Sequence, residues 1–117
     1  FFMSEKRKIG NLGEEIVAKF LIENGYEILD RNYLKPYGEI DIVAIKNDIV
    51  CFVEVKARKN IKFGYPREAV NFYKQQRIAK ASQTYLIENN LTNYIMRFDV
   101  AEVFTESRKI NYIENAF

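Results

Sequence analysis

Two acidic residues and a lysine, Asp41, Glu54 and Lys56, stand in two neighbouring stretches of apolar, β-type sequence. Carboxylates are the hard oxygen ligands that Mg²⁺ and Mn²⁺ prefer, and Mg²⁺ is commonly held by one or two of them together with a substrate phosphate. A bound divalent cation lowers the pKa of its water and polarises the phosphate. A nearby ammonium can orient the attacking water or stabilise charge on the phosphate. These residue types therefore suffice for metal-dependent phosphodiester hydrolysis, with Asp41 and Glu54 as the expected metal ligands.

A predicted β-hairpin is the element that would bring these residues together. Residues 39–45 alternate in the manner of a strand, and residues 46–48 are polar and turn-like. Residues 49–56 form a short apolar run, rich in β-branched side chains, that ends in the Glu-Val-Lys segment. We expect this second strand to lie in the centre of a sheet.

The loop length of the hairpin decides its register. With the common two-residue loop, Lys46 faces Ile49, and the numbers of each pair of opposed residues sum to 95. Asp41 and Glu54 then lie directly opposite one another, with Cβ atoms about 4.5–5.5 Å apart. Lys56 shares their face because side chains alternate along a strand. A four-residue loop keeps this register, whereas a three-residue loop shifts it by one residue and separates the groups.

Two carboxylates placed opposite one another are unfavourable unless a cation lies between them. Their charges repel, and partial burial raises the cost further. The alternative is that Glu54 and Lys56 are neighbours on a solvated strand face, because these residue types are common and their spacing alone is a weak signal. The expected central position of the strand favours a site, since charges are disfavoured there without a function.

Glu14 is a candidate fourth member of the site. It lies at the edge of the apolar face of a helix expected over residues 4–24. A carboxylate there could be a further metal or water ligand, or an ordinary residue at the margin of an amphipathic helix, and the periodicity leaves both open. Glu15 points elsewhere, and we expect it to be an exposed partner of Lys8 and Lys19.

Basic residues of a second expected helix form a candidate nucleic-acid surface. Lys74, Arg77 and Lys80 recur every three residues, and Arg58 lies in the loop before the helix. Such a stripe could follow a phosphate backbone, although a charge run is more often a solvated helix face. Tyr65 and Tyr73 could stack on bases, with core or surface packing as the more common role of each ring.

The elements that carry these residues predict an α/β domain in the order α-β-β-β-α-β-β, a mixed β-sheet flanked by helices. One stripe of the first helix is apolar and comprises Ile9, Leu12, Ile16 and Phe20, widened by Val17 and Leu21. Gly25 is the expected C′ residue of this helix. A strand is expected over about 26–30, followed by a loop over 32–38 that contains Pro36.

The second half of the chain predicts one helix and two strands. The helix is expected to begin at Pro66 or Asn71 and to run to about Asn89. Its inward residues are Ile78, Ala81, Tyr85 and Leu86. Strands over about 95–104 and 110–113 complete the sheet.

Length and composition indicate a single cytoplasmic domain. The 117 residues fit one domain over 1–117, and two phenylalanines precede Met3, so residues 1–3 are expected to be disordered or not native. The single cysteine, Cys51, cannot form an internal disulfide. No apolar stretch approaches the roughly 18 residues that span a bilayer, and the start of the chain lacks the pattern of a signal peptide.

The chain contains no histidine. This excludes histidine-based zinc sites, Ser-His-Asp triads, Cys-His nucleophiles and a histidine general base. The net charge is only +2, so the field of the whole molecule predicts little. A nucleic-acid binder of this composition needs a local basic face instead.

Several short segments occur in an order and at a spacing that match a known family. They are Gly13-Glu14, Gly25-Tyr26, Gly38-Glu39-Ile40-Asp41, Phe52-Val53-Glu54-Val55-Lys56-Ala57-Arg58, Lys74, Arg77-Ile78 and Arg97-Phe98-Asp99-Val100. On these segments the chain resembles the YraN family of bacterial proteins, which are uncharacterised and predicted to be endonuclease-like. The resemblance runs from about Gly10 to the C-terminus.

The resemblance implies the restriction-endonuclease-like fold of the PD-(D/E)xK superfamily, which includes archaeal Holliday-junction resolvases. It implies that Asp41, Glu54 and Lys56 occupy the signature positions of that superfamily. It also implies that Glu14 occupies the acidic position of the first helix and that Lys74 occupies the position of a basic residue on the second helix. The family has no established substrate, so the resemblance transfers a fold and a site but not a reaction.

The leading hypothesis is an Mg²⁺- or Mn²⁺-dependent endonuclease, with DNA favoured over RNA and structured or branched DNA as the expected substrate. Its metal ligands would be Asp41, Glu54 and Glu14, its water-orienting group Lys56, and its backbone contacts Arg58, Lys74, Arg77 and Lys80. One alternative is a non-catalytic nucleic-acid-binding module that keeps the nuclease fold. Another is a protein-interaction domain whose charged cluster is only structural. A homodimer would suit an enzyme that cuts a junction at two sites, and no membrane partner is expected.

Overall fold

The computed structural model describes residues 3–60 and 70–117 of the chain. Helices and strands follow one another in this part as α1 (Glu5–Glu23), β1 (Glu27–Lys35), β2 (Gly38–Lys46), β3 (Ile49–Arg58), α2 (Phe72–Glu88), β4 (Ile95–Phe104) and β5 (Lys109–Ile113). The predicted α/β class and the predicted order α-β-β-β-α-β-β are confirmed. The expectation for residues 1 and 2 falls outside the described residues.

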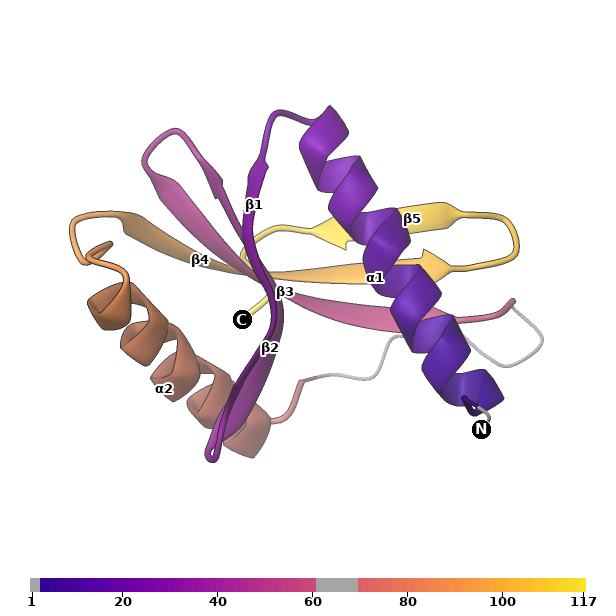
Figure 1. Cartoon of the computed structure of the whole chain (residues 1–117), viewed down its shortest axis with the longest axis horizontal. Helices are drawn as coiled ribbons and strands as arrows, with labels where there is room; N and C mark the ends of the chain where they lie inside the picture. Colours follow the sequence, from indigo (N-terminus) through magenta and orange to yellow (C-terminus); the bar gives the residue numbers. More distant parts are fainter. Residues whose placement is uncertain (1–2, 61–69) are drawn as a thin grey trace.

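The five strands form one mixed sheet in the order β1-β2-β3-β4-β5 (Figure 1). Neighbouring strands are antiparallel except β3 and β4, which run parallel. A parallel pair needs a crossover connection, and α2 lies within that connection. The second strand of the hairpin, β3, is therefore central, as the sequence predicts.

The two helices cover opposite faces of the sheet, and each closes its own core (Figure 1). The core beneath α1 includes Ile42, Ala44, Cys51 and Val53 of the hairpin. The core beneath α2 includes Ile40, Val43, Val50 and Phe52. Successive residues of β3 thus pack into opposite cores, because side chains along a strand point alternately to its two faces. Fully burying a side chain of this size contributes roughly 1.5–3 kcal/mol, so both cores hold the hairpin in place.

Helix α1 begins and ends as its sequence predicts. The Ser4 hydroxyl accepts a hydrogen bond from the Arg7 N–H at 3.1 Å, which makes Ser4 the N-cap. Gly25 follows the helix with φ +88°, the left-handed conformation expected of a C′ residue. The Tyr26 N–H donates to the Leu21 carbonyl at 3.0 Å, which closes the last turn. The chain is thereby directed into β1.

The buried face of α1 is turned relative to the predicted stripe. Of the predicted residues, Ile16, Val17 and Leu21 are buried, but Leu12 is exposed and the unpredicted Gly13 is buried. A Cβ atom on Gly13 would lie only 2.6 Å from the Cβ of Ala57 on β3, so the helix and the strand approach closely at this glycine. The apolar stripe was predicted from the positions of large apolar side chains. Gly13 has no side chain, so such a prediction cannot identify it as a residue of the buried face.

The prediction of a short first strand followed by a loop over 32–38 is wrong. β1 continues to Lys35, and the hairpin turn to β2 lies at Pro36 and Tyr37. β1 is an edge strand and is irregular, with a register shift between Ile28 and Asp30 and a φ of 54° at Asn32. Edge strands tolerate such irregularities because one of their sides needs no partner, which is why loop-like residues are found inside a strand here.

The remaining elements lie close to their predicted positions. Asn71 is the N-cap of α2, since its side chain accepts from the Lys74 N–H at 2.8 Å. The other predicted start, Pro66, lies outside the described residues, as does Tyr65. The predicted inward residues Ile78, Ala81, Tyr85 and Leu86 are all buried. The predicted strands over 95–104 and 110–113 correspond to β4 and β5.

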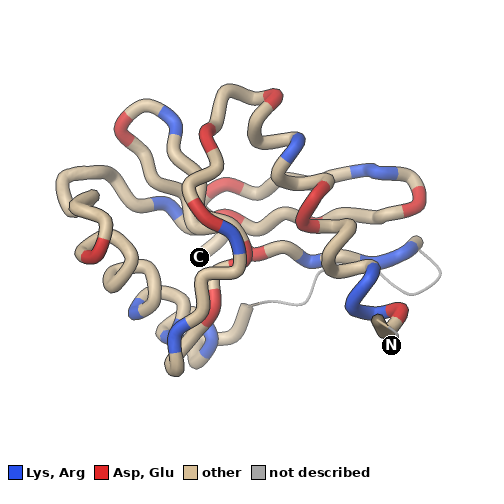
Figure 2. Tube along the Cα trace, in the orientation of Figure 1, with Lys and Arg blue, Asp and Glu red and all other residues tan. Residues whose placement is uncertain are grey.

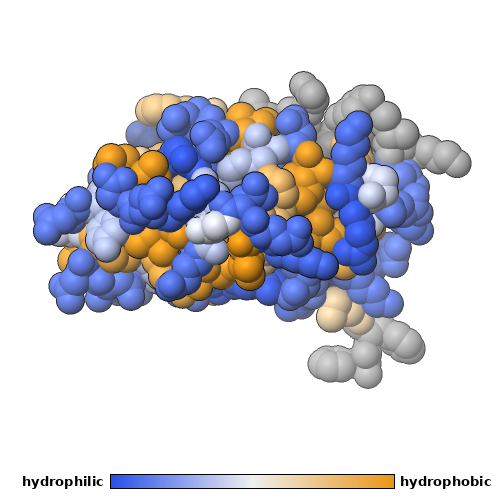
Figure 3. Space-filling model, turned by 90° about the horizontal axis from the view of Figure 1, so that it is seen from above, coloured by the Kyte–Doolittle hydropathy of each residue, from blue (hydrophilic) through white to orange (hydrophobic). Residues whose placement is uncertain are grey.

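Charged and apolar residues are distributed unevenly over the surface. Lys and Arg positions gather where α2 begins beside the β1–β2 turn, and again where α1 begins beside the end of β3, with acidic positions between the two groups (Figure 2). On the face seen in Figure 3, hydrophobic surface is broken up by hydrophilic side chains. Neither described helix combines the length and the apolar character that crossing a bilayer requires.

Candidate functional site

The β2–β3 hairpin has the predicted register. Its pairs run from Lys46↔Ile49 to Ile42↔Val53, so the residue numbers of each pair sum to 95. The turn contains two residues, and Asn47 adopts the left-handed conformation with φ 55°. The loop thus has an even number of residues, which is the condition for the predicted register.

Asp41 lies where the regular pairing of β2 is interrupted. Within the described hairpin, the β1–β2 pairing passes over Asn32 and Asp41, and the β2–β3 pairing stops at Ile42. Ile40 packs beneath α2 and Ile42 beneath α1, so the side chains on either side of Asp41 enter different cores. The Asp41 Oδ2 atom accepts a hydrogen bond from the Val55 N–H at 2.8 Å. The carboxylate thus takes the place of a main-chain acceptor and is aimed at β3.

Glu54 and Lys56 lie on β3 beside Asp41 and are both largely buried. The side chains of Glu54 and Lys56 are 11% and 19% exposed. Lys56 Nζ is 3.8 Å from Glu54 Oε1, which agrees with their predicted common face. The Lys74 ammonium of α2 reaches the same oxygen and donates to it at 2.6 Å. Two lysines from different elements therefore converge on one carboxylate.

The pKa of Asp41 reports the electrostatics of this site. Burial and the neighbouring Glu54 carboxylate raise it from the usual 3.8 to about 8, against the opposing effect of the Val55 hydrogen bond. The Glu14 and Glu39 carboxylates raise it further. Burial and the neighbouring carboxylates therefore favour the protonated form of Asp41. A divalent cation would relieve the repulsion, because it interacts favourably with both ionised carboxylates.

Glu14 of α1 lines a hollow together with Asp41, and it has partners of its own. Its Oε1 atom is 3.7 Å from Arg31 Nη2 on β1. Burial raises the Glu14 pKa, whereas a hydrogen bond with Asn32 and the charge of Arg31 lower it. The expected partnership of Glu15 with lysines on its own helix is wrong, because Arg31 Nη1 donates to Glu15 Oε1 at 2.6 Å.

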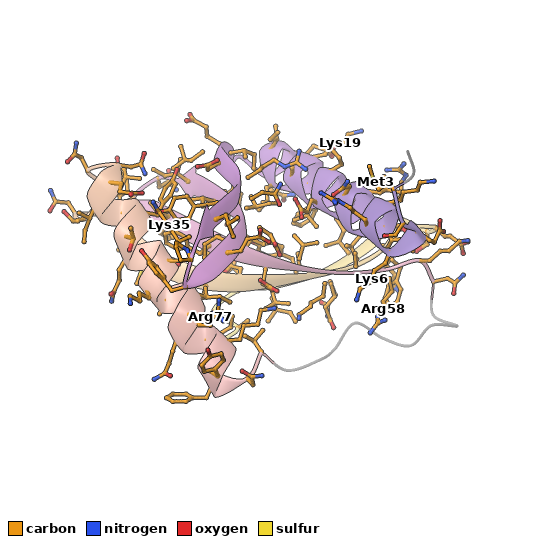
Figure 4. All side chains as sticks on the ribbon, turned by 60° about the horizontal axis from the view of Figure 1, so that its bottom comes forward. Met3, Lys6, Lys19, Lys35, Arg58 and Arg77 are labelled. Carbon is orange, nitrogen blue, oxygen red and sulfur yellow. The ribbon has the colours of Figure 1, made fainter. Side chains whose placement is uncertain are left out.

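Two hollows meet at Asp41. The larger, of about 640 Å³, lies on the α1 side and is lined by residues that include Lys6, Glu14, Asp41, Lys56 and Arg58. The smaller, of about 350 Å³, lies on the α2 side and is lined by residues that include Asp41, Glu54, Tyr73, Lys74 and Arg77. In Figure 4, Lys6 and Arg58 lie at one end of the molecule, whereas Lys35 and Arg77 lie at the other. The acidic site is thus flanked on both sides by basic residues.

The basic residues of α2 do not form one free stripe. Lys74 is paired with Glu54, while Arg77 Nε donates to the Tyr37 carbonyl at 2.6 Å. Lys80 lies over the Tyr37 ring, with Nζ 4.6 Å from its centroid. A Cβ on Gly38 would lie 2.8 Å from the Arg77 carbonyl oxygen, so the hairpin and α2 are in close contact here. This contact fixes the β1–β2 turn beside the smaller hollow.

The predicted metal-ligand set is only partly assembled by the side chains as they stand. Among residues 3–60 and 70–117, no group of three or more Asp, Glu or Cys side chains is placed to hold a metal ion. Glu54 is engaged by Lys74, and Glu14 by Arg31. Asp41 and Glu54 nevertheless offer two hard oxygen ligands, the minimum that proteins commonly provide for Mg²⁺. A ligand set that also includes Glu14 stays a prediction.

A second buried polar cluster was not predicted. Asp99 is fully buried and accepts hydrogen bonds from Arg97 Nε at 3.0 Å, from the Tyr112 hydroxyl at 2.6 Å and from the Asn115 N–H at 3.2 Å. Arg97 Nη2 also donates to the Tyr26 hydroxyl at 2.6 Å. The cluster thus joins β4 and β5 to the residue that precedes β1. The sequence signals were the alternation of Arg97 and Asp99 on one face of a strand and their place in a segment that matches the YraN family.

Comparison with known sequences places the chain among proteins that share nearly its whole length. Residues 13–103 match the profile of a family described as Uncharacterised protein family UPF0102. A UPF0102 protein of Clostridioides difficile is 48% identical over 98% of this chain and 100% of its own. UPF0102 proteins of Alkaliphilus metalliredigens and Acetivibrio thermocellus are 46% and 45% identical, over 95% and 97% of this chain and 98% and 94% of theirs.

Proposed function

This chain belongs to the UPF0102 (YraN) family, and we propose that it is a divalent-metal-dependent endonuclease acting on nucleic acid. The observation that carries the proposal is the pair of buried carboxylates, Asp41 and Glu54, with the Lys56 ammonium 3.8 Å from Glu54. Burial and the Glu54 carboxylate make Asp41 hard to ionise, and a divalent cation between the two groups would favour the ionised form of both. Structured or branched DNA is the preferred substrate in this proposal.

The donor chemistry of the site fits Mg²⁺ or Mn²⁺. Asp41 and Glu54 would hold the ion, with Glu14 as a further ligand or as an acceptor for its water. A bound divalent cation supplies a polarised phosphate and a water of lowered pKa. A bound cation would lower the raised pKa of Asp41, because it interacts favourably with the ionised carboxylate.

The lysines of the site have separate roles. Lys56 is held on β3 beside Glu54, where its ammonium orients the attacking water and offsets negative charge on the phosphate. Lys74 comes from α2, and its side chain is 42% exposed, so it can leave Glu54 and bind a phosphate of the substrate. Its ion pair in the free protein keeps Glu54 partly neutralised until substrate and metal arrive.

The basic residues on both sides of the acidic pair define a path for a nucleic-acid backbone. Lys6 and Arg58 line the hollow beside α1, and Lys74 and Arg77 line the hollow beside α2. Lys80 lies next to Arg77 at the hairpin turn. Phosphate contacts of this kind position a strand without reading its sequence. We further propose a cytoplasmic location and a homodimer, in which two sites would serve the two strands of a junction.

A cleavage assay tests the proposal. The full chain would be incubated with Mn²⁺ and with branched, duplex and single-stranded DNA and with RNA, together with a Glu54→Gln variant. We expect cleavage that requires Mn²⁺ and is lost in Glu54→Gln, because the amide no longer supplies a negative charge to the metal. Glu23→Gln, at an exposed position in the last turn of α1, should cleave normally. No Mn²⁺-dependent product from any substrate would refute the enzyme proposal.

The close contact between Lys74 and Glu54 favours one alternative, a nucleic-acid-binding module without catalysis. At 2.6 Å the ammonium could balance the Glu54 charge permanently, with no need for a metal. This alternative predicts that Lys74→Ala weakens DNA binding while Asp41→Asn leaves it unchanged. It also predicts affinity that falls as the salt concentration rises, without any cleavage.

A further inference from the structure

Two large aromatic side chains at the start of α2 are unusually exposed. Phe72 is 72% and Tyr73 is 67% exposed. The helix begins at its Asn71 cap and turns its buried face, with Ile78 and Ala81, toward the sheet. Phe72 and Tyr73 therefore contribute little to the core. Exposed aromatic rings beside polar groups commonly mark contact surfaces, because burying a large ring against a partner removes much apolar surface from water.

Only one of these two rings belongs to the candidate site. Tyr73 lines the hollow of about 350 Å³ together with Asp41, Glu54 and Lys74, whereas Phe72 is not among the described residues that line it. The two side chains are adjacent on a helix and so point in directions about 100° apart. The pair thus provides a site residue and a matched control of similar size and exposure.

The Tyr73 ring is oriented by a cation. The Arg77 guanidinium lies over it, with Cζ 5.6 Å from the ring centroid. Arg77 is itself held, because its Nε donates to the Tyr37 carbonyl at 2.6 Å. One face of the ring is therefore covered by a guanidinium that is anchored to the hairpin turn, and the exposure of Tyr73 leaves surface of the ring open to a ligand.

The surroundings of the ring match the requirements of an unpaired nucleotide. Single-stranded nucleic acid is bound by positive charge along its backbone and by aromatic side chains that stack on its bases. Lys74 and Arg77 flank Tyr73 in the same hollow and supply the charge. In an intact duplex the bases are stacked on one another, and a base must leave the stack before it can reach a side-chain ring.

We propose that Tyr73 stacks on an unpaired base next to the phosphodiester that is cleaved, so that the substrate class is nucleic acid with at least one unpaired nucleotide at the cleavage point. This inference rests on the proposed nuclease function for the position of the cleaved bond. The stacking itself depends only on the ring, its guanidinium and the open hollow. Flaps, gaps and single strands contain such nucleotides, whereas a blunt duplex does not.

Binding measurements without metal test the stacking apart from cleavage. Short single-stranded oligonucleotides that carry 2-aminopurine would be titrated in EDTA, with affinity and base fluorescence as the two readouts. We expect quenching on binding and tighter binding than to a blunt duplex of the same length. Tyr73→Leu should weaken single-strand binding by about tenfold and abolish the quenching, whereas Tyr73→Phe should retain both.

The controls separate stacking from charge and from folding. Phe72→Leu should leave affinity and quenching unchanged, and both leucine variants should melt at the temperature of the native protein because the rings are exposed. Tyr73→Leu should keep the salt dependence of binding, since no phosphate contact is lost, whereas Lys74→Ala should reduce it. Equal affinity for blunt duplex and single strand, or quenching that survives Tyr73→Leu, would overturn the inference.

The failure of this inference and the failure of the proposed function are distinguishable. Mn²⁺-dependent cleavage of a blunt duplex at full rate by Tyr73→Leu would refute the stacking and leave the nuclease proposal intact. Stacking without cleavage of any substrate would refute the nuclease proposal and leave the unpaired-base preference intact.

Discussion

Replacing Gly13 by alanine tests how closely α1 must approach the sheet. The added Cβ would lie 2.6 Å from Ala57 Cβ and 3.2 Å from Val103 Cγ1. Carbon atoms in ordinary contact are about 3.5–4.0 Å apart, so the helix and β3 must separate by roughly 1 Å. Ala57 Cβ is attached directly to the main chain and cannot move away by a change of rotamer. The whole of α1 must therefore shift.

Gly10→Ala provides a matched control on the same helix. A Cβ at Gly10 would meet no heavy atom within 4 Å, so this variant should gain only helix propensity, about 0.5–1 kcal/mol. Gly13→Ala gains the same propensity but overpacks the core, which costs about 1–3 kcal/mol. The difference between the two variants isolates the packing cost, and we expect Gly13→Ala to be less stable than Gly10→Ala by that amount.

Urea unfolding of the two variants and the native protein measures this difference. A shift in the midpoint at constant slope reports the change in the free energy of unfolding. Because Glu14 follows Gly13 directly, movement of α1 should also displace a carboxylate of the site and weaken Mn²⁺-dependent cleavage in Gly13→Ala alone. Equal stabilisation by both substitutions would refute the close packing of α1 on β3.

Two further predictions concern buried polar groups. The pKa of Asp41 is about 8 in the folded protein and close to 3.8 in the unfolded chain, so folding takes up a proton at neutral pH. Without metal, the contribution of this group to the free energy of unfolding should be fully present below pH 4 and should fall by about 1 kcal/mol per pH unit as the pH rises toward the folded pKa. Asp41→Asn should remove that slope in urea titrations run in EDTA between pH 5 and pH 8, and an unchanged slope would contradict the burial of Asp41. Tyr112→Phe should lower the free energy of unfolding by about 1–3 kcal/mol, because buried Asp99 loses a hydrogen-bond donor, and it should leave Mn²⁺-dependent cleavage intact. A loss of cleavage in a folded Tyr112→Phe protein would show that this cluster serves the site.

The hairpin could be predicted from the sequence because its determinants are local. A two-residue polar turn between two apolar runs decides the register, and the predicted pairs from Lys46↔Ile49 to Ile42↔Val53 are found. The pairing ends before the predicted Asp41–Glu54 pair, and the Asp41 carboxylate accepts from the Val55 N–H instead. The alternation along β3 then places Lys56 with Glu54. The helix ends were equally predictable, since Ser4 and Gly25 act through hydrogen bonds and conformations within a few residues of themselves.

Other features depend on contacts between distant segments and could not be predicted in the same way. The turned face of α1 follows from the space that Ala57 leaves for Gly13. The length of β1 follows from its position at the edge of the sheet. The ion pairs of Arg31 with Glu14 and of Lys74 with Glu54 join residues from different elements. Periodicity within one element carries no information about such partners.

The central claim is that Asp41 and Glu54 together hold a divalent cation, and calorimetric titration with Mn²⁺ tests it most directly. The titration would use the native protein, Asp41→Asn, Glu54→Gln and the exposed control Glu23→Gln, each checked for folding. We predict that the native protein and Glu23→Gln bind Mn²⁺ with the same affinity, and that each substitution at the pair weakens binding by about a hundredfold or more. Native protein that binds no Mn²⁺, or Asp41→Asn and Glu54→Gln variants that bind it as well as the native protein, would contradict the account.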